Sequence, residues 1–311
     1  MSKIIKIGTR DSELALWQAH TVEKKLKDLG YLTEIVAVKS TGDIILDKPL
    51  YELGITGIFT KTLDVAMLKG EVDIAVHSMK DVPTALPKGI IQAAVLERAS
   101  TLDILVHKGD LSFLENSATI PTTIGTGSLR RKAQWLHKYP THHVEDLRGN
   151  INTRMQKLND NHWNGAIFAA AGLERINLKP ETFLNLDWMI PAPAQGAMMV
   201  VAMENDSFSR GALEQLNHKE TEICTFVERQ FLKTLEGGCT APIGALAEIK
   251  EDVISLKGAL FSLDGKHKLE IEKSVKIDLY QNFGELCATE ILNNGGSELM
   301  FAIKQELSKK H

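Results

Sequence analysis

The stretch VDIAVHSMKDVP, residues 72–83, decides the fold. Residues 72–76 form an apolar run typical of a strand buried on both faces of a sheet, and the chain becomes polar where this strand should end. In open α/β sheets, ligands bind beyond the carboxyl ends of the strands. We therefore expect Ser78, Lys80 and Asp81 to face a ligand. The alternative is a surface Lys–Asp pair, which contributes only about 0–1 kcal/mol.

Strands and helices alternate on both sides of this stretch. The pattern predicts strands over 4–7, 34–38 and 72–76, and helices after Ser12 and over 60–69. The first helix has an apolar face of Leu14, Trp17, Val22, Leu26 and Leu29. The same alternation is predicted later in the chain, with strands over 123–125, 143–147 and 166–169 and helices over 128–139 and 150–158. Alternation of this kind predicts parallel sheets covered by helices, hence two α/β lobes.

The predicted organisation is completed by a strand late in the chain and by a C-terminal part in which strands follow one another instead of alternating with helices. The strand over 198–203 could return to the first sheet after the linker-like residues 191–196. From residue 220 a helix runs to Leu235, with Ile223, Phe226, Val227 and Phe231 on one face. Strands over 245–249, 253–261 and 269–277 and two closing helices predict a small α+β domain. The predicted domains are residues 1–98 with 197–216, residues 99–196, and residues 217–311.

Composition excludes several classes of protein. The chain has 311 residues, of which 43% are hydrophobic, and a net charge of -4, which disfavours a general nucleic-acid binder. Three cysteines, Cys224, Cys239 and Cys287, are too few for a disulfide framework and lack zinc-site spacing. Charges near the N-terminus interrupt any signal-peptide apolar region, and no apolar run approaches the roughly 18 residues of a membrane span. We expect a cytoplasmic protein with no membrane or metal.

Arginine is concentrated in one part of the chain. Lysine outnumbers arginine overall, but between residues 130 and 175 five arginines outnumber three lysines. They follow predicted strand ends or begin predicted helices, where free backbone N–H groups attract anions. Arginine is preferred where a carboxylate or phosphate is gripped at two points. We expect a site for several anionic groups, formed by Arg130, Arg131, Arg148, Arg154 and Arg175, with Arg10 from the other lobe.

The anion is not predicted to be a nucleotide. Residues 54–62 superficially resemble a P-loop, but Thr60 stands where a glycine should precede Lys61. No GxGxxG motif follows the first strand. The adjacent His142 and His143 would point to opposite faces of a strand, so we interpret them as structural or surface residues.

Cys239 stands in LEGGCTAPIG, residues 235–244, on a predicted loop. A thiolate nucleophile needs a nearby histidine or a helix N-terminus, and Cys239 has neither in sequence. This favours a sulfur that is alkylated once and kept as an anchor. Cys224 and Cys287 fall within helical patterns and are expected to pack internally.

The chain resembles the porphobilinogen deaminase, or hydroxymethylbilane synthase, family. The resemblance is carried in family order by IGTRDSELALWQA, STGDIILD, VDIAVHSMKDVP, GTGSLRR, LRGNINTR, AAAGLERI, PAPAQGAM and LEGGCTAPIG. It implies two lobes similar to a type II periplasmic binding protein and a third domain that carries the cofactor loop. One departure is Gly127, where the family often has a hydroxyl.

The resemblance also implies a chemistry. Cys239 would hold a dipyrromethane primer through a thioether, and four porphobilinogen units would be added head to tail with loss of ammonia before water releases hydroxymethylbilane. Asp81 would help to protonate the leaving amine and stabilise the azafulvenium-type cation. The implied cofactor contacts are Lys80, Asp81, Thr126, Ser128, Arg130, Arg131, Arg148, Gly149, Arg154, Gln195 and Cys239. The implied substrate contacts are Arg10, Ser12, Phe59, Arg148, Arg154 and Arg175.

Residues 40–59 with Lys61 would form a lid, and the enzyme is expected to be a monomer. Two other classes of function compete with this transferase. A non-catalytic anion-binding protein on the same fold would have no use for Cys239. A nucleic-acid-binding protein is disfavoured by the net charge and by an aromatic content of only 6%.

Overall fold

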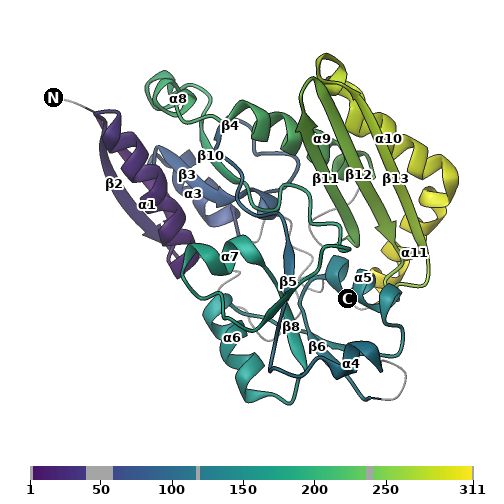
Figure 1. Ribbon diagram of the computed structural model, residues 1–311. Coiled ribbons are helices and arrows are strands. Elements are labelled where there is room, and N and C mark those ends of the chain that lie inside the picture. The colour runs from purple at the N-terminus through teal and green to yellow at the C-terminus, as the bar shows by residue number, and fades with distance from the viewer. Residues whose placement is uncertain (1–2, 40–58, 117–119, 236–240, 310–311) are drawn as a thin grey trace. The chain divides into compact units, whose positions relative to one another are not determined.

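Figure 1 shows the computed structural model, which describes residues 3–39, 59–116, 120–235 and 241–309. The chain forms two compact units. The first unit comprises residues 1–45, 55–99 and 195–223, and the second comprises residues 46–54, 100–194 and 224–311. Among the described residues, no helix has both the length and the apolar character needed to cross a membrane.

The first unit contains a five-stranded sheet of order β2-β1-β3-β10-β4. Its strands are β1 (Ile4–Arg10), β2 (Leu32–Val38), β3 (Ile74–Ser78), β4 (Ile90–Val95) and β10 (Met198–Met203). β1 runs parallel to β2 and β3, whereas β10 is antiparallel to β3 and β4. The predicted return of the late strand to the first sheet is therefore confirmed.

Helices cover both faces of this sheet. Helices α1 (Glu13–Asp28) and α8 (Ser207–Glu214) pack on one face around Ile5, Ile7 and Val200. Helix α3 (Lys61–Leu68) packs on the other face, where Gly8 leaves room for Leu63. A Cβ atom at Gly8 would lie 3.1 Å from a Leu63 methyl carbon and 2.9 Å from one of Val72.

The second unit contains a sheet with the same arrangement of strands. Its order is β7-β6-β8-β5-β9, with parallel β7, β6 and β8 followed by the antiparallel β5. The strands are β5 (Asp103–His107), β6 (Thr123–Gly125), β7 (His143–Glu145), β8 (Gly165–Ala169) and β9 (Phe183–Asn185). The helices are α4 (Ser112–Glu115), α5 (Leu129–Lys138), α6 (Ile151–Asp160) and α7 (Ala170–Arg175). The predicted pair of α/β lobes is confirmed.

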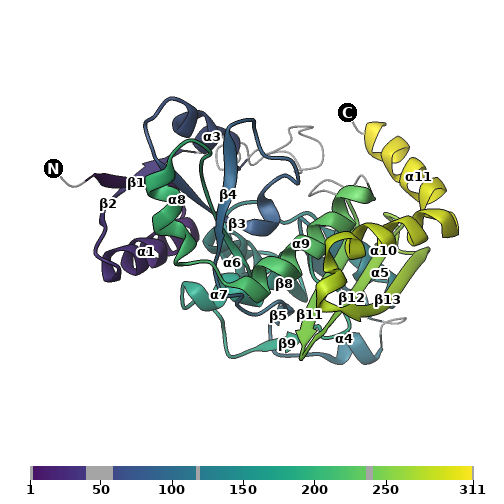
Figure 2. The ribbon, with the colours of Figure 1, turned by 90° about the horizontal axis from the view of Figure 1, so that it is seen from above.

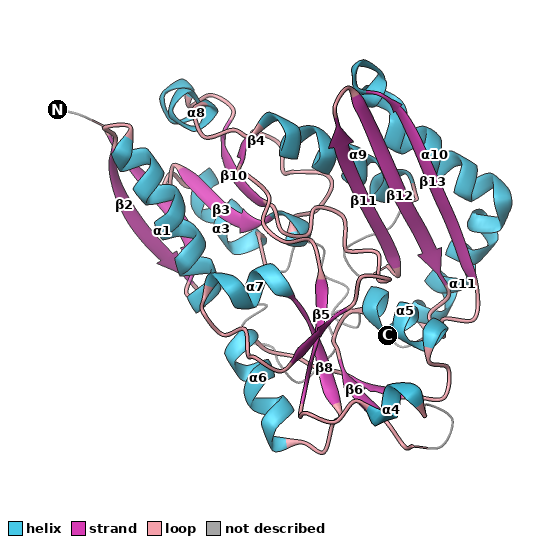
Figure 3. Ribbon diagram, in the orientation of Figure 1, coloured by secondary structure: helices cyan, strands magenta, loops and turns pink. Residues whose placement is uncertain are grey.

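A three-stranded antiparallel sheet of order β11-β12-β13 also belongs to the second unit. It comprises β11 (Ile243–Lys250), β12 (Val253–Phe261) and β13 (Lys268–Lys276). The helical segments around it are α9 (Lys219–Thr234), a 3-10 helix (Ile277–Asn282), α10 (Phe283–Ile291), a π turn (Leu292–Gly296) and α11 (Ser297–Ser308). Figure 2 shows α10 alongside β12 and β13, and Figure 3 distinguishes the strands of all three sheets from the helices. The small α+β part is confirmed, while the three domain boundaries stay a prediction.

Some predicted helix faces and strand limits are wrong. Trp17 and Leu29 are 37% and 43% exposed, whereas Val22 and Leu26 are buried as predicted and share the buried face of α1 with Ala15 and Gln18. Phe226, predicted to lie on the apolar face of α9, is 44% exposed. β3 begins two residues later than predicted and ends at Ser78.

Candidate active site

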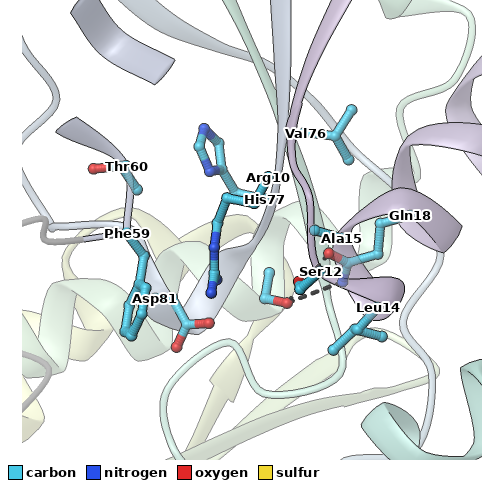
Figure 4. Close-up of a pocket in the computed structure, with 11 residues that line it drawn as sticks. Arg10, Ser12, Leu14, Ala15, Gln18, Phe59, Thr60, Val76, His77 and Asp81 are labelled. Carbon is cyan, nitrogen blue, oxygen red and sulfur yellow. Dashed lines mark hydrogen bonds between the residues drawn. The ribbon is translucent and has the colours of Figure 1, made fainter. Parts of the chain in front are cut away.

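One pocket in the first unit collects five residues that were predicted to face a ligand: Arg10, Ser12, Phe59, Ser78 and Asp81. β1 and β3 are parallel neighbours, so their carboxyl ends meet at one edge of the sheet. Arg10 ends β1, and Asp81 ends the short 3-10 turn that continues β3. Figure 4 shows both side chains in the pocket beside the ring of Phe59, with Ser12 also lining it. The Arg10 guanidinium carbon lies 4.4 Å from the centre of the Phe59 ring, a cation–π contact.

Two further residues of this pocket were not predicted. Gln18 of α1 donates from Nε2 to Oγ of Ser78 at 2.9 Å, which ties the first helix to the end of β3. His77 is almost fully buried, and burial, together with the nearby charge of Arg10, lowers its pKa to about 4. Its imidazole is therefore neutral at neutral pH. His77 directly precedes Ser78, the last residue of β3, and both residues line the pocket.

Lys80 and Gln195, two predicted cofactor contacts, are brought together in the first unit. Lys80 donates from Nζ to Oε1 of Gln195 at 3.2 Å. The backbone carbonyl of Gln195 accepts from Nε of Arg98 at 2.8 Å, and Gln195 is only 1% exposed. Gln195 is thus fixed from both ends and holds the Lys80 ammonium in place.

The GTGSLRR motif opens helix α5 in the second unit. β6 ends at Gly125, and Ser128 caps α5 by accepting a hydrogen bond from the backbone N–H of Arg131 at 3.4 Å. Thr126 is buried, and its hydroxyl accepts from the Ser128 N–H at 3.3 Å. The sequence therefore forms the predicted strand–turn–helix unit, with an N-terminus of the kind that attracts anions.

Arg130 and Arg131 lie side by side and are almost fully buried. They are 4% and 5% exposed, and both pair with the carboxylate of Asp103. Burial is the main effect that lowers the pKa of Arg130, and Asp103 opposes this effect. Asp103 was not predicted as a site residue, because an acid within the apolar run of a buried strand carries no motif of its own.

The LRGN motif forms a tight turn before α6. Gly149 has a φ of +110°, which favours glycine, and Asn150 caps α6 by accepting from the Thr153 N–H at 2.9 Å. Arg148 is 6% exposed, and burial lowers its pKa, with the Asp146 charge acting in the opposite direction. Arg154 donates from Nε to the Gly149 carbonyl at 2.7 Å.

The two arginine-bearing turns are in direct contact, and this accounts for Gly127. β6 and β7 are parallel neighbours, so the residues that follow them meet. A Cβ atom at Gly127 would lie 2.6 Å from the Leu147 carbonyl oxygen, so a side chain there would require the turns to move apart. Arg175, by contrast, ends α7 after β8, where burial lowers its pKa to about 10 against the opposing charge of Glu174.

Other predicted residues lie outside the described residues or away from these sites. Cys239 and most of the predicted lid, residues 40–58, are outside the described ranges. Lys61 begins α3 and is exposed. Cys224 and Cys287 are buried, in agreement with their predicted packing role. Within the described ranges, no group of three or more His, Cys, Asp or Glu side chains is placed to hold a metal ion.

Two family models match the chain. Residues 5–210 match the model described as "Porphobilinogen deaminase, dipyromethane cofactor binding domain", which covers more than half of the chain. Residues 222–293 match "Porphobilinogen deaminase, C-terminal domain". The chain belongs to the porphobilinogen deaminase family. The predicted resemblance is confirmed over both matched segments.

Curated relatives from the porphobilinogen deaminase family align over almost the whole chain. "Porphobilinogen deaminase" of Desulfitobacterium hafniense is 40% identical over 98% of this chain and 99% of its own length. "Porphobilinogen deaminase" of Campylobacter hominis is 39% identical, covering 95% of this chain and 97% of that protein. "Probable porphobilinogen deaminase" of Methanocaldococcus jannaschii is 42% identical, covering 88% and 94%.

Solved structures of binding proteins are also similar to this member of the porphobilinogen deaminase family. The methionine binding protein MetQ has a TM-score of 0.40 at 14% identity, covering 68% of this chain and 89% of that one. A substrate binding domain of a putative amino acid ABC transporter from Streptococcus pneumoniae has a TM-score of 0.43 at 12% identity, covering 68% and 91%.

The residues of the second unit fit the acidic cofactor of the porphobilinogen deaminase family. A dipyrromethane built from porphobilinogen carries acetate and propionate groups, so its site needs positive charge. Two guanidiniums against one carboxylate leave one net positive charge around Asp103. Nε of Arg130 is buried and has no hydrogen-bond partner among the described residues. This charge and this remaining donor match a carboxylate ligand.

Proposed function

We propose that the chain is a hydroxymethylbilane synthase whose coupling chemistry takes place at Asp81. It is a transferase of tetrapyrrole and heme biosynthesis that joins four porphobilinogen molecules on a dipyrromethane primer and releases hydroxymethylbilane. The observation that carries the assignment is the pocket shared by Asp81 and Arg10, in a chain whose residues 5–210 match the cofactor-binding domain of the family.

Asp81 has the chemistry that each coupling needs. A coupling forms a carbon–carbon bond, breaks the carbon–nitrogen bond of the aminomethyl group, and releases ammonia and the proton of the attacked ring carbon. Positive charge develops on the substrate as the amine leaves. The carboxylate of Asp81 stabilises this charge and handles the proton, while the Arg10 guanidinium beside it binds a carboxylate of the incoming porphobilinogen.

Phe59 and Ser12 complete the substrate-binding side of the same pocket. Phe59 packs against the Arg10 guanidinium, which restricts the orientations of that cation. Arg148, Arg154 and Arg175 are proposed to bind further substrate carboxylates. The residues proposed to hold the primer are Lys80, Asp81, Thr126, Ser128, Arg130, Arg131, Arg148, Gly149, Arg154 and Gln195.

Cys239 is proposed to carry the primer through a thioether. When bound, the dipyrromethane supplies the terminal pyrrole carbon to which the first porphobilinogen is joined. A permanent tether keeps the growing chain on the enzyme. The burial of Cys224 and Cys287 supports this choice among the three cysteines.

Intact mass spectrometry tests the tether. Protein made in cells that produce porphobilinogen should be heavier than its sequence by one dipyrromethane, and Cys239→Ser should lack this added mass. Cys224→Ser is the matched control and should keep the added mass. Active protein with only the sequence mass would refute the proposed tether.

We also propose that the enzyme acts as a monomer in the cytoplasm, with porphobilinogen as its partner and without nucleic acid or membrane. The acidic net charge of -4 supports the absence of a nucleic-acid partner. Sedimentation of the purified chain at micromolar concentration, with and without duplex DNA, tests both the oligomeric state and the absence of this partner.

A further inference from the structure

Asp103 occupies a fixed position inside the second unit. It begins β5, which lies between β8 and β9, and it stands opposite Ala169 in the register of β5 with β8. Its backbone carbonyl accepts from the Leu186 N–H at 3.0 Å. The residue is 0% exposed, so its carboxylate is held by a strand within the sheet and not by a loop.

The Asp103 carboxylate joins the two arginines through both of its oxygens. Oδ2 lies 2.7 Å from Nη1 of Arg130, and Oδ1 accepts from Nε of Arg131 at 2.9 Å with Nη2 at 2.8 Å. Backbone carbonyls complete the arrangement, because Arg130 donates to Ile190 at 2.7 Å and Arg131 donates to Ile167 at 3.0 Å. Each guanidinium is therefore oriented at two points.

The charges in this cluster do not cancel. Two guanidiniums side by side repel each other, and this repulsion and their burial both disfavour the charged state. One carboxylate between them offsets only part of this cost and leaves one net positive charge. A buried excess charge is costly, so it needs a further anion or a function that justifies it.

We propose that Asp103 is a positioning residue that holds Arg130 and Arg131 as a preformed receptor for a carboxylate of the dipyrromethane. This inference rests on the proposed function. Asp103 itself does not touch the ligand, since all of its side chain is buried. It acts by fixing where the two guanidiniums point, and the positive charge that it leaves uncancelled attracts the ligand carboxylate.

Primer assembly on the apoprotein is the measurement that isolates this role. Apoprotein is mixed with porphobilinogen, and intact mass spectrometry follows the gain of the dipyrromethane with time. Asp103→Asn keeps the size of the side chain but removes its charge, so primer assembly should be slower by about tenfold or more, as for other residues that orient a ligand-binding group. Circular dichroism and thermal unfolding establish the temperature at which each apoprotein is folded.

Gln134→Leu is the matched control on the same helix. Gln134 is 2% exposed and makes two hydrogen bonds with the backbone of Ile190, both at 2.8 Å, without contacting Asp103. Gln134 shares the Ile190 carbonyl with Arg130, but Gln134→Leu leaves this acceptor and the Asp103 carboxylate in place for the arginine pair. This variant should lose stability yet assemble the primer within about threefold of the wild-type rate. Equal slowing in both variants would reduce Asp103 to a structural residue and overturn the proposal.

Asp103→Glu covers the case in which the Asp103→Asn variant does not fold. It keeps the charge but displaces the carboxylate by one methylene, so a positioning role predicts a folded apoprotein with slowed assembly. Assembly at the wild-type rate in either folded variant would overturn the inference. Wild-type apoprotein that gains no dipyrromethane from porphobilinogen would instead overturn the proposed function, and this inference with it.

Discussion

Asp81 is expected to dominate turnover at the scale of single residues. Asp81→Asn should fold normally but lower kcat by about 10²-fold or more, because a fixed charge near developing positive charge is a large catalytic contribution. Asp73→Asn is the control, since Asp73 precedes β3 at the opposite end of the strand and accepts from the Lys6 N–H. A steady-state assay with porphobilinogen measures kcat for both variants. A near-normal kcat in the Asp81→Asn variant would refute the catalytic role of Asp81.

His77 should make stability depend on pH. Its pKa is about 4 in the folded protein against 6.5 as its ordinary value, so the unfolded chain binds the proton more readily. The stability contributed by neutral His77 is present above pH 6.5 and is lost as the pH falls toward 4, by about 3 kcal/mol in all. Urea unfolding at pH 7 and pH 4.5 measures this loss.

His77→Gln is the variant for this measurement, and it should reduce the loss of stability between the two pH values. The exposed His162→Gln serves as the control and should follow the wild type. A pH profile unchanged in His77→Gln would mean that His77 does not stay neutral inside the fold.

Sequence motifs identified the residues that carry chemistry, but not the residues that support them. Asp81 and Arg10 could be predicted because each follows a strand end, and the structure places them in one pocket. Asp103 could not be predicted as a supporting residue, because it stands at the start of an apolar strand without any motif. Its role becomes visible only from its ion pairs with the two arginines of α5 in the folded protein. The burial of Arg130 and Arg131 was missed for the same reason.

At the scale of elements, the turn at Gly149 is expected to set the geometry of the LRGN motif. Gly149→Ala should destabilise the protein by more than the roughly 1–2 kcal/mol that a left-handed conformation costs an L-residue. The added Cβ would also lie 2.7 Å from a Thr153 methyl carbon, against a φ of +110°. The start of α6 and the positions of Arg148 and Arg154 should shift as a result.

Gly30→Ala separates backbone strain from this steric clash. Gly30 has a φ of +88°, but a Cβ there would meet nothing within 4 Å. Thermal unfolding should therefore show the smaller loss for Gly30→Ala, and only Gly149→Ala should raise KM for porphobilinogen. Equal losses of stability with unchanged KM in both variants would contradict a role for this turn in binding.

Helices and strands were predicted best where the arrangement of apolar residues allowed only one interpretation. The apolar run predicted the strand β10, and its suggested return to the first sheet is confirmed by its pairing with β3. The predicted face of α1 was partly wrong because Trp17 is exposed, whereas Val22 and Leu26 pack in the core with the sheet as predicted, together with Ala19.

At the scale of the whole molecule, the repeated strand order is the main feature that sequence comparison within the chain did not reveal. The first two sheets share the arrangement of parallel and antiparallel strands, yet the chain has no internal repeat in sequence identity. The two sheets tolerate different residues because each position needs only an apolar side chain of suitable size. What differs between them is the chemistry of the turns, with Asp81 after β3 and the arginines after β6 and β7.

Glu228 connects distant parts of the second unit and should control its stability. It is 0% exposed in α9, and its carboxylate accepts from the Ala194 N–H at 2.6 Å and from the Ala247 N–H at 2.7 Å. Ala247 lies in the edge strand β11, so its outward N–H has no neighbouring strand to bind. Ala194 has a φ of +63°, an uncommon conformation for alanine that this hydrogen bond helps to hold.

Glu228→Gln should therefore cost about 3 kcal/mol, because a carboxamide has one acceptor oxygen for two buried N–H donors and turns an NH₂ group toward one of them. The melting temperature should fall by about 4–5 °C. Glu222→Gln on the same helix removes a carboxylate that pairs with exposed Lys219, so it should change stability by less than about 0.5 kcal/mol. Hydrogen exchange at the Ala194 and Ala247 amides should accelerate only in Glu228→Gln, and unchanged protection at both would show that the carboxylate does not hold the segment and the strand together.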